Sequence, residues 1–482
     1  LASESLERRA DAYAGQVDPR GEGIPIVVIN ALAWDRTDLV TVQVGFGCPG
    51  IRGVTVCGPD GAEVPVQIAE TVSNPDGSMV SVRLAFVARS GPALGHAVYR
   101  VVGTADPMLQ PTPEPLDGPC SLQTDRFRAD FDASGALAGL QSLADGRQLL
   151  GGPSNVFAQE RDEGDLWEPY KPLDGGSRIA MKDRHPLAPD AVFSNAAAPT
   201  RMAVLRGPVY SEVQVEGPLG EGSYSTIVRA VMGLDRLDIR TEVRNQEKFV
   251  RYRAAFRTDM VNASRYDEIP FGAIERPDGL EFPAQNWTDR SDDRGGLALL
   301  NRGLPGVNHA DAAILLSLLR STCIVAYGFG GGYEPGMTSD TGFEIGKRKA
   351  FDYALLPHAG DWRLADLPRR GVEFNHPLIV VKTASHGGRL GSARGIMEPL
   401  APGLVMTSLR PATDGDMIIR VYESLGRDGM NARLSWSRPI EGAWSLNLMD
   451  EEEDRLPIHD GGVSLTLRPF EIKTLRIRLQ HG

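Results

Sequence analysis

The feature that most constrains the fold is a recurring pattern of short apolar runs that are rich in β-branched residues and bounded by Gly, Pro or Asp. Such runs are typical of β-strands, because branched side chains pack well on a pleated surface and Gly and Pro mark the turns between them. The pattern predicts a mostly β protein that contains several β-sandwich domains. Examples are Ile24–Ile29, Leu39–Val44, Val82–Val87, Tyr210–Glu216, Ser225–Val231, Leu237–Val243 and Ile472–Ile477.

The start of the chain has a different period. Its apolar residues recur at steps of four, four, three and four, which places them on one face of a helix that precedes the strands. Asp18-Pro19 ends this helix, since the residue before a proline is pushed out of the α region. We expect the apolar face to need partners that the rest of the chain does not obviously supply. This face consists of Ala2, Leu6, Ala10, Tyr13 and Val17.

Further helical signals are few. Ala310–Leu319 is the one additional candidate, and a buried strand fits this short apolar run equally well. The chain has 482 residues, which is more than one hydrophobic core usually serves. A proline-rich stretch, Pro107–Pro119, favours an extended linker between domains. We expect a residual helix at 1–20, a small sandwich at 21–106, the linker at 107–119, a large central sandwich at 120–400 and a small C-terminal sandwich at 401–482.

Charge and cysteine content exclude several classes of function. The net charge of −12 argues against a nucleic-acid or membrane partner, because both attract clustered Lys and Arg. The longest largely apolar stretch is about half of what a bilayer span needs. The first residues show neither a basic nor an apolar region of a signal peptide. The four cysteines have no CxxC spacing, so the sequence predicts a soluble protein of the reducing cytoplasm.

Several blocks, taken in order, resemble the C-terminal half of family-38 glycoside hydrolases, the retaining zinc-dependent α-mannosidases. Each block alone is a weak pattern of a strand and its turn, and the order and spacing over essentially the whole chain make the resemblance specific. The opening helix resembles the last helix of the bundle that links the catalytic and β-domains in that family. The blocks are Val27–Trp34, Tyr266–Gly272, Glu275–Pro277, Phe282–Trp287, Gly296–Asn301, Ser317–Ser321, Phe351–His358 and Arg468–Leu475.

The resemblance implies a parent enzyme that hydrolyses terminal α-mannosides with retention, through a glycosyl-enzyme intermediate and with zinc as cofactor. In that family the zinc ligands and catalytic carboxylates lie in an N-terminal barrel and the helical bundle that follows. We therefore expect no catalytic residue and no metal ligand in this chain, which alone would be inactive. Its expected partners are an α-mannoside, held through the parent enzyme, and the catalytic domain. Homo-oligomerisation is compatible with the resemblance.

The residues themselves agree with the absence of catalytic machinery. No two of the eight histidines lie within eight residues of each other, so no HxH or HExxH pattern exists. His309-Ala310-Asp311 forms a His-x-Asp triplet, for which a loop pair is the simpler interpretation. Consecutive carboxylates such as Asp267 and Glu268 point to opposite faces of a strand and cannot flank one glycosidic bond.

Two loops and one aromatic residue are candidates for substrate binding. Asn301, Arg302 and Gly303 follow an apolar strand and offer an amide and a guanidinium suited to sugar hydroxyls, although an ordinary hairpin turn also fits. The resemblance suggests that this loop closes part of a mannose pocket. Asp340 lies in a second polar loop, and the ring of Tyr266 could stack on a sugar. The alternatives to an α-mannosidase portion are a free-standing carbohydrate-binding module and an assembly domain.

Overall fold

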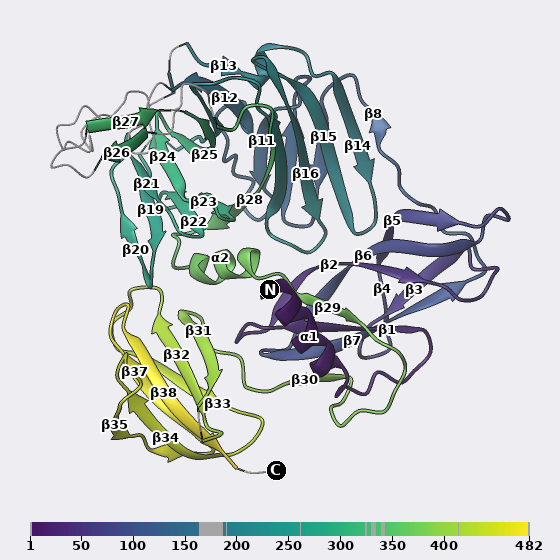
Figure 1. Ribbon diagram of the computed structural model, residues 1–482, viewed down its shortest axis with the longest axis vertical. Helices are drawn as coiled ribbons and strands as arrows, with labels where there is room; N and C mark the ends of the chain where they lie inside the picture. The colour runs from purple at the N-terminus through teal and green to yellow at the C-terminus, as the bar shows by residue number, and fades with distance from the viewer. Residues whose placement is uncertain are drawn as a thin grey trace. The chain divides into compact units, whose positions relative to one another are not determined.

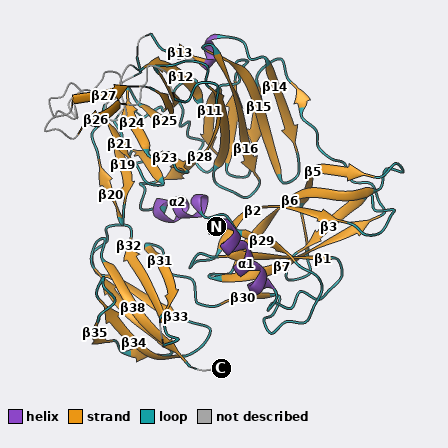
Figure 2. Ribbon diagram, in the orientation of Figure 1, coloured by secondary structure: helices purple, strands orange, loops and turns teal. Residues whose placement is uncertain are grey.

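The protein is mostly β, as predicted, and its strands form several layered sheets (Figures 1 and 2). The computed structural model describes residues 2–162, 187–188, 190–260, 262–322, 325–328, 334–338, 343–412 and 414–480. The chain divides into two compact units. The first unit comprises Leu1–Thr112, Gly207–Tyr210 and Pro368–Gly482, and the second comprises Pro113–Arg206 and Ser211–Leu367.

The N-terminal part of the first unit is a small sandwich of two antiparallel sheets. Their facing side chains, which include Ile26, Val42, Phe86 and Tyr99, form one buried core. One sheet has the order β29-β1-β7-β3-β4, with β30 also paired to β7: β1 (Ile24–Asn30), β3 (Gly53–Cys57), β4 (Glu63–Val64), β7 (Gly95–Thr104), β29 (Ile379–Lys382) and β30 (Ala393–Gly395). The other has the order β2-β6-β5: β2 (Arg36–Gly45), β5 (Val66–Ser73) and β6 (Met79–Gly91).

Two strands of this sandwich come from far along the chain. Strand β29 pairs with β1, so that Val28 lies opposite Val380, and β30 pairs with the start of β7. Both strands lie within the span 120–400 that the sequence analysis gives to the large sandwich. The domain limits predicted from the sequence remain a proposal. The pairings show that residues 379–382 and 393–395 form their strand hydrogen bonds with the N-terminal sandwich.

Helix α1 (Ala2–Ala14) lies on the outer face of the β29-β1-β7 strands (Figure 1). Ala10, Ala14 and Val17 are buried against side chains of those strands, whereas Leu6 is 52% exposed. Tyr13 is half-buried, and its hydroxyl lies 2.9 Å from Nδ1 of His96. The C-terminal half of the apolar face therefore has partners within the chain, although none was obvious from the sequence.

The C-terminal part of the first unit is a second small sandwich around its own core. One sheet has the order β31-β32-β38-β34-β35: β31 (Leu404–Pro411), β32 (Met417–Glu423), β34 (Ile440–Leu446), β35 (Glu452–Arg455) and β38 (Ile472–Leu479). The other has the order β33-β37-β36: β33 (Met430–Ser435), β36 (Ile458–His459) and β37 (Gly462–Leu467).

Helix α2 (Leu367–Asn375) was not predicted from the sequence. It is short, and Gly371 in its middle weakens the helical pattern. Tertiary contacts compensate for this weakness. Glu373 accepts a hydrogen bond from the indole of Trp34 at 2.8 Å, and Arg369 donates to the carbonyl of Leu400 at 2.8 Å.

The second unit is a large sandwich. Its main layer, called here the large sheet, contains ten strands of the described chain in the order β20-β19-β22-β23-β28-β17-β16-β15-β14-β8. Their bounds are β8 (Glu114–Pro115), β14 (Arg201–Arg206), β15 (Tyr210–Leu219), β16 (Gly222–Val231), β17 (Leu237–Arg244), β19 (Ser264–Ile269), β20 (Gly272–Glu275), β22 (Trp287–Ser291), β23 (Gly295–Asn301) and β28 (Arg348–Ala359).

The remaining strands of this unit form the facing layer and two short sheets. The facing sheet has the order β13-β12-β18-β25-β24-β21: β12 (Val156–Arg161), β13 (Val192–Phe193), β18 (Val250–Arg257), β21 (Glu281–Pro283), β24 (Gly306–Ala310) and β25 (Ala313–Ser321). The short sheets and a 3₁₀ turn comprise β9 (Cys120–Gln123), β10 (Phe127–Phe131), β11 (Leu137–Ser142), β26 (Val325–Gly328), β27 (Glu334–Thr338) and η1 (Ser194–Ala196).

Aromatic side chains join the two layers of the large sandwich. The ring of Phe157 lies 5.0 Å from that of Tyr224, and the ring of Phe256 lies 5.9 Å from that of Tyr353. All four side chains belong to one buried core, and each contributes about 1.5–3 kcal/mol through burial. The run Ala310–Leu319, which the sequence left open between helix and strand, lies mostly in β25 with its first residue ending β24.

A carboxyl group is also buried in the large sheet. Glu268, on β19, accepts a hydrogen bond from the backbone amide of Asn286 at 2.7 Å. Burial raises the pKa of Glu268 to about 8. Its side chain is therefore stable in this position mainly as the neutral acid.

Two further observations bear on the sequence predictions. Among the described residues, neither helix has the length and apolar character that crossing a membrane would require. Of the described cysteines, Cys48, Cys57 and Cys120 are free thiols. The fourth, Cys323, lies outside the described residues.

The contact between α1 and the sheet can be tested by hydrogen exchange. Nε2 of His96 lies 2.7 Å from the carbonyl of Gly391, so Nδ1 is left to accept the proton of the Tyr13 hydroxyl. Tyr13→Phe should therefore lower the free energy of unfolding by about 1 kcal/mol and speed amide exchange in residues 10–17. Leu6→Ser, on the exposed turn, is the matched control. Fast exchange throughout residues 2–17 in the parent chain would show that the helix does not dock.

Glu268→Gln should change how stability depends on pH. The folded-state pKa of about 8 lies above the ordinary value of 4.5, so the stabilising contribution is complete below pH 4.5 and is lost as pH rises through 8. Relative to the parent, the variant should become more stable between pH 5 and 8 and level off above that range. Thermal unfolding at several pH values measures this difference, with exposed Glu275→Gln as the control. A stability difference between variant and parent that does not change with pH would contradict the assignment.

Candidate functional site

Charged side chains gather on the outer face of the large sheet, the face that points away from the buried core. Alternation along each strand places every second residue on this face. The register then sets these residues in rows across β17 and β28. Arg240 lies opposite Asp352, Glu242 opposite Ala350, and Arg244 opposite Arg348.

Arg302 belongs to this charged face. It lies in the turn after β23, and its backbone amide donates to the carbonyl of Asp352 at 3.2 Å. Its guanidinium lies 3.7 Å from the Asp352 carboxylate, which also accepts a hydrogen bond from Arg240 at 2.9 Å. The Arg302 side chain is 42% exposed. One carboxylate thus holds two guanidinium groups at the surface, one from a strand and one from the turn.

The two residues beside Arg302 shape the turn. The side chain of Asn301 is fully buried, and its amide oxygen accepts a hydrogen bond from the backbone of Leu304 at 3.3 Å. Its amide nitrogen donates to the carbonyl of Ala284 at 3.4 Å. Gly303 has a φ of +69°, which glycine adopts without strain. Of these three predicted residues, only Arg302 therefore presents its side chain at the surface.

Tyr266 lies elsewhere on the large sheet. It is on β19, with β22 between its strand and β23. Its hydroxyl donates to the carboxylate of Glu275 at 3.2 Å, and its ring lies 5.7 Å from that of Trp362. Burial, with the nearby Glu275 charge, raises the pKa of the phenol. The structure therefore does not bring Tyr266 into the turn of Arg302. Asp340, the remaining predicted residue, lies outside the described residues.

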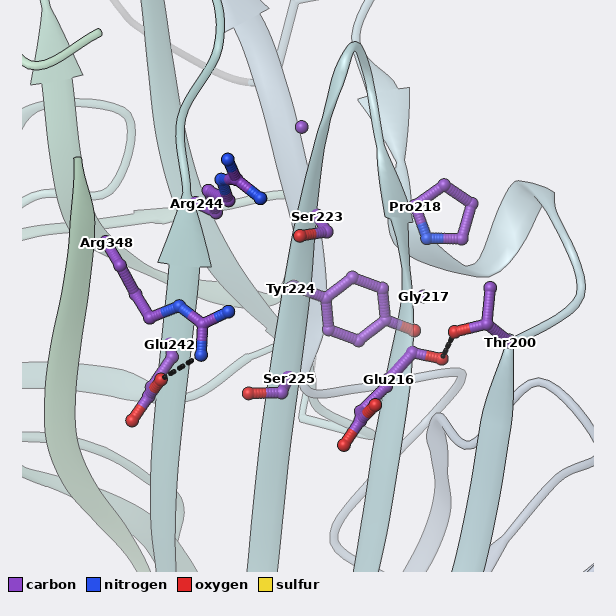
Figure 3. Close-up of a pocket in the computed structure, with 11 residues that line it drawn as sticks. Thr200, Glu216, Gly217, Pro218, Ser223, Tyr224, Ser225, Glu242, Arg244 and Arg348 are labelled. Atoms are coloured by element: carbon purple, nitrogen blue, oxygen red, sulfur yellow. Dashed lines mark hydrogen bonds and ion pairs between the residues drawn. The ribbon is translucent and has the colours of Figure 1, made fainter. Parts of the chain in front are cut away.

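The charged face is hollowed into a groove of about 370 Å³ over strands β15, β16, β17 and β28 (Figure 3). Ser223 and Ser225 line its middle, and longer charged side chains stand on either side (Figure 3). Arg348 reaches from β28 to the carboxylate of Glu242 at 3.3 Å. The groove is lined by Thr200, Glu216, Gly217, Pro218, Gly222, Ser223, Tyr224, Ser225, Glu242, Arg244 and Arg348.

The sequence analysis did not find this groove. A local signal was present, because Ser223 and Ser225 lie two residues apart, on either side of Tyr224, and the next strand along the chain carries charges at the same spacing. The groove nevertheless depends on which strands lie side by side. Arg244 and Arg348 are more than 100 residues apart in sequence and meet only through the pairing of β17 with β28.

His309, of the His-x-Asp triplet, is a core residue. Its Nε2 lies 2.9 Å from the hydroxyl of Thr288, which in turn donates to Asp267 at 2.6 Å. Burial, with the charges of Arg265 and Arg290, lowers the pKa of His309 well below its ordinary value. Among the described residues, no group of three or more His, Cys, Asp or Glu side chains is arranged to hold a metal ion. Zinc therefore has no fitting ligand set in this part of the chain.

Comparison with known proteins places the large sandwich and the C-terminal sandwich in one family. Residues 122–324 match the glycosyl hydrolases family 38 C-terminal domain, and residues 403–475 match the glycosyl hydrolases family 38 C-terminal beta sandwich domain. Alpha-mannosidase 2C1 of Mus musculus is 23% identical over 97% of this chain and 40% of its own length. Alpha-mannosidase G of Dictyostelium discoideum is 27% identical over 56% of this chain and 25% of its own length.

Solved structures show the same fold. An alpha-mannosidase from Enterococcus faecalis V583 superposes with a TM-score of 0.76 and 16% identity, covering 98% of this chain and 58% of the bacterial chain. The present chain spans about 40% of the length of the mammalian relatives that it matches. The family matches, their order along the chain and the shared fold lead to one conclusion: the chain belongs to glycosyl hydrolase family 38 and carries the C-terminal β-domains of that family.

Proposed function

We propose that this chain is the β-domain portion of a retaining α-mannosidase, and that it supports and partly lines the active site. The observation that carries the proposal is the match of the large sandwich and the C-terminal sandwich to C-terminal domains of family 38, together with the similarity to relatives named as α-mannosidases. The substrate would be a terminal α-mannoside. The catalytic domain would be the chain's principal partner.

The reaction assigns different tasks to different parts of the enzyme. Retention through a glycosyl-enzyme intermediate needs two carboxyl groups about 5 Å apart, one as nucleophile and one as acid and base. In this proposal, those carboxyl groups and the zinc belong to residues outside this chain. Zinc would supply binding of sugar hydroxyls there.

Arg302 is the residue of this chain that we assign to substrate. Its guanidinium is held at the surface by Asp352, in a turn whose shape is fixed by buried Asn301. A guanidinium positioned in this way can donate hydrogen bonds to sugar hydroxyls without reordering the turn. Polar residues on loops that a rigid sheet positions are common binding groups.

The 482-residue chain by itself should hold no stoichiometric zinc and should not hydrolyse an aryl α-mannoside. The reason is that the described residues offer neither a fitting metal-ligand group nor an assigned pair of catalytic carboxylates. Elemental analysis and a chromogenic assay of the purified chain measure both properties. One tightly held zinc ion, or turnover that a chelator abolishes, would contradict the proposal.

Arg302→Ala in the complete enzyme should lower kcat/KM about tenfold, the effect of losing one hydrogen bond from a charged group. The melting temperature should stay nearly unchanged, because exposed ion pairs contribute little to stability. Steady-state kinetics and thermal unfolding provide the two measurements.

Arg128→Ala is a suitable control for that variant. Arg128 is also exposed and also paired, donating to Asp130 at 2.8 Å, but it lies on β10, outside the large sheet. Its loss should leave the kinetics unchanged. Unchanged kinetics in Arg302→Ala would remove this turn from the active site, and a large fall in its melting temperature would show a structural role.

A further inference from the structure

The groove of Figure 3 contains polar side chains that have no hydrogen-bond or ion-pair partner among the described residues. The side chain of Arg244 has no hydrogen bond or ion pair with any described residue, although Arg244 lies directly opposite Arg348. Like charges in directly opposed positions on a sheet are unfavourable. Arg348 is neutralised by Glu242, so Arg244 is the cation that remains without a counter-charge.

The hydroxyl groups of the groove are similarly available. Ser223 lies opposite Arg244, and Ser225 lies opposite Glu242, so both serines sit in rows with charged neighbours. Within the described residues, neither hydroxyl has a protein partner. Each can donate one hydrogen bond and accept others, which suits a ligand with both hydroxyl groups and acceptor oxygens.

The local charge favours an anion. The lining of the groove has two guanidinium groups, those of Arg244 and Arg348, and two carboxylates, those of Glu216 and Glu242. Arg201, on β14 and outside the lining, pairs with Glu216, so the groove together with this neighbour has one excess positive charge, on a chain whose net charge is −12. Arg201 lies 3.5 Å from Glu216, so each carboxylate has a guanidinium partner and Arg244 supplies the excess.

Shape and polarity together define the ligand class. A volume of about 370 Å³ lies within the range of small-molecule sites. Guanidinium groups recognise phosphate oxygens through paired hydrogen bonds. The carboxylates of Glu216 and Glu242 can accept hydrogen bonds only from donor groups such as hydroxyls. They repel a ligand that is anionic along its whole length.

We infer that this groove binds a small hydroxylated phosphate ester of the sugar-phosphate class. The phosphate would lie against Arg244 and Arg348, and the hydroxyl groups would contact Ser223, Ser225 and the two carboxylates. The inference does not use the proposed mannosidase activity, and binding is measured without turnover. Failure of either proposal therefore leaves the other standing.

Isothermal titration calorimetry of the 482-residue chain tests the inference, with mannose 6-phosphate, inorganic phosphate and unmodified mannose as probes. Mannose 6-phosphate should bind at least tenfold more tightly than either fragment, because only the ester reaches both the guanidinium and the hydroxyl-binding groups. Equal affinity for inorganic phosphate would overturn the assignment to a sugar ester. Failure of mannose 6-phosphate to bind would overturn the site itself.

Variants locate the binding in the groove. Arg244→Ala should weaken mannose 6-phosphate at least tenfold and leave the melting temperature unchanged, since the side chain is exposed and unpaired within the described residues. The affinity of Arg244→Lys for mannose 6-phosphate should lie between that of Arg244→Ala and that of the parent, because lysine keeps the charge and loses the paired hydrogen-bond geometry of the guanidinium. Arg128→Ala should bind as the parent does, because Arg128 lies on β10 and does not line the groove. Parent-like affinity in Arg244→Ala would overturn the inference.

Discussion

Strand β28 is the element on which the second unit depends. It pairs with β23 on one side and with β17 on the other, and so joins the two halves of the large sheet. Tyr353, on its inner face, contributes to the core and lies 2.7 Å from the hydroxyl of Thr241. Asp352, one residue earlier, points to the outer face. A single strand therefore fixes both the buried interior and the charged surface, because successive side chains alternate between them.

Register has the same double effect across the sheet. A slip of one residue between β17 and β28 would exchange the two faces, placing Arg240 and Arg244 in the core. The buried side chains of the sandwich prevent such a slip, since guanidinium groups without partners are costly to bury. The positions of Arg302, Arg348 and the groove serines are thus set by apolar packing on the opposite face. The arrangement of charged and hydroxyl groups on the outer face is therefore a consequence of how the core packs.

The sequence predicted the fold class well because strand patterns are local. It could not decide Ala310–Leu319, since a short buried strand has the same uniform apolar character as a buried helix. Helix α2 was not predicted because its stability comes from contacts with residues far away in sequence, such as Trp34. The site was only partly predictable. Turn chemistry drew attention to Arg302, but the burial of Asn301 and the grouping of charges at the groove depend on long-range pairing that a single sequence does not reveal.

Strand β29 is synthesised long after β1, the strand with which it pairs, and this delay affects folding during synthesis. Strand β1 is complete once residue 30 has left the ribosome, but its partner ends only at residue 382. At roughly 5–20 residues per second, that interval lasts on the order of 20–70 seconds. Throughout it, one edge of β1 has unsatisfied backbone groups, which attract other strands. The nascent chain thus carries an open sheet edge while the residues between β1 and β29 are synthesised, and this period is when chaperone protection would matter most.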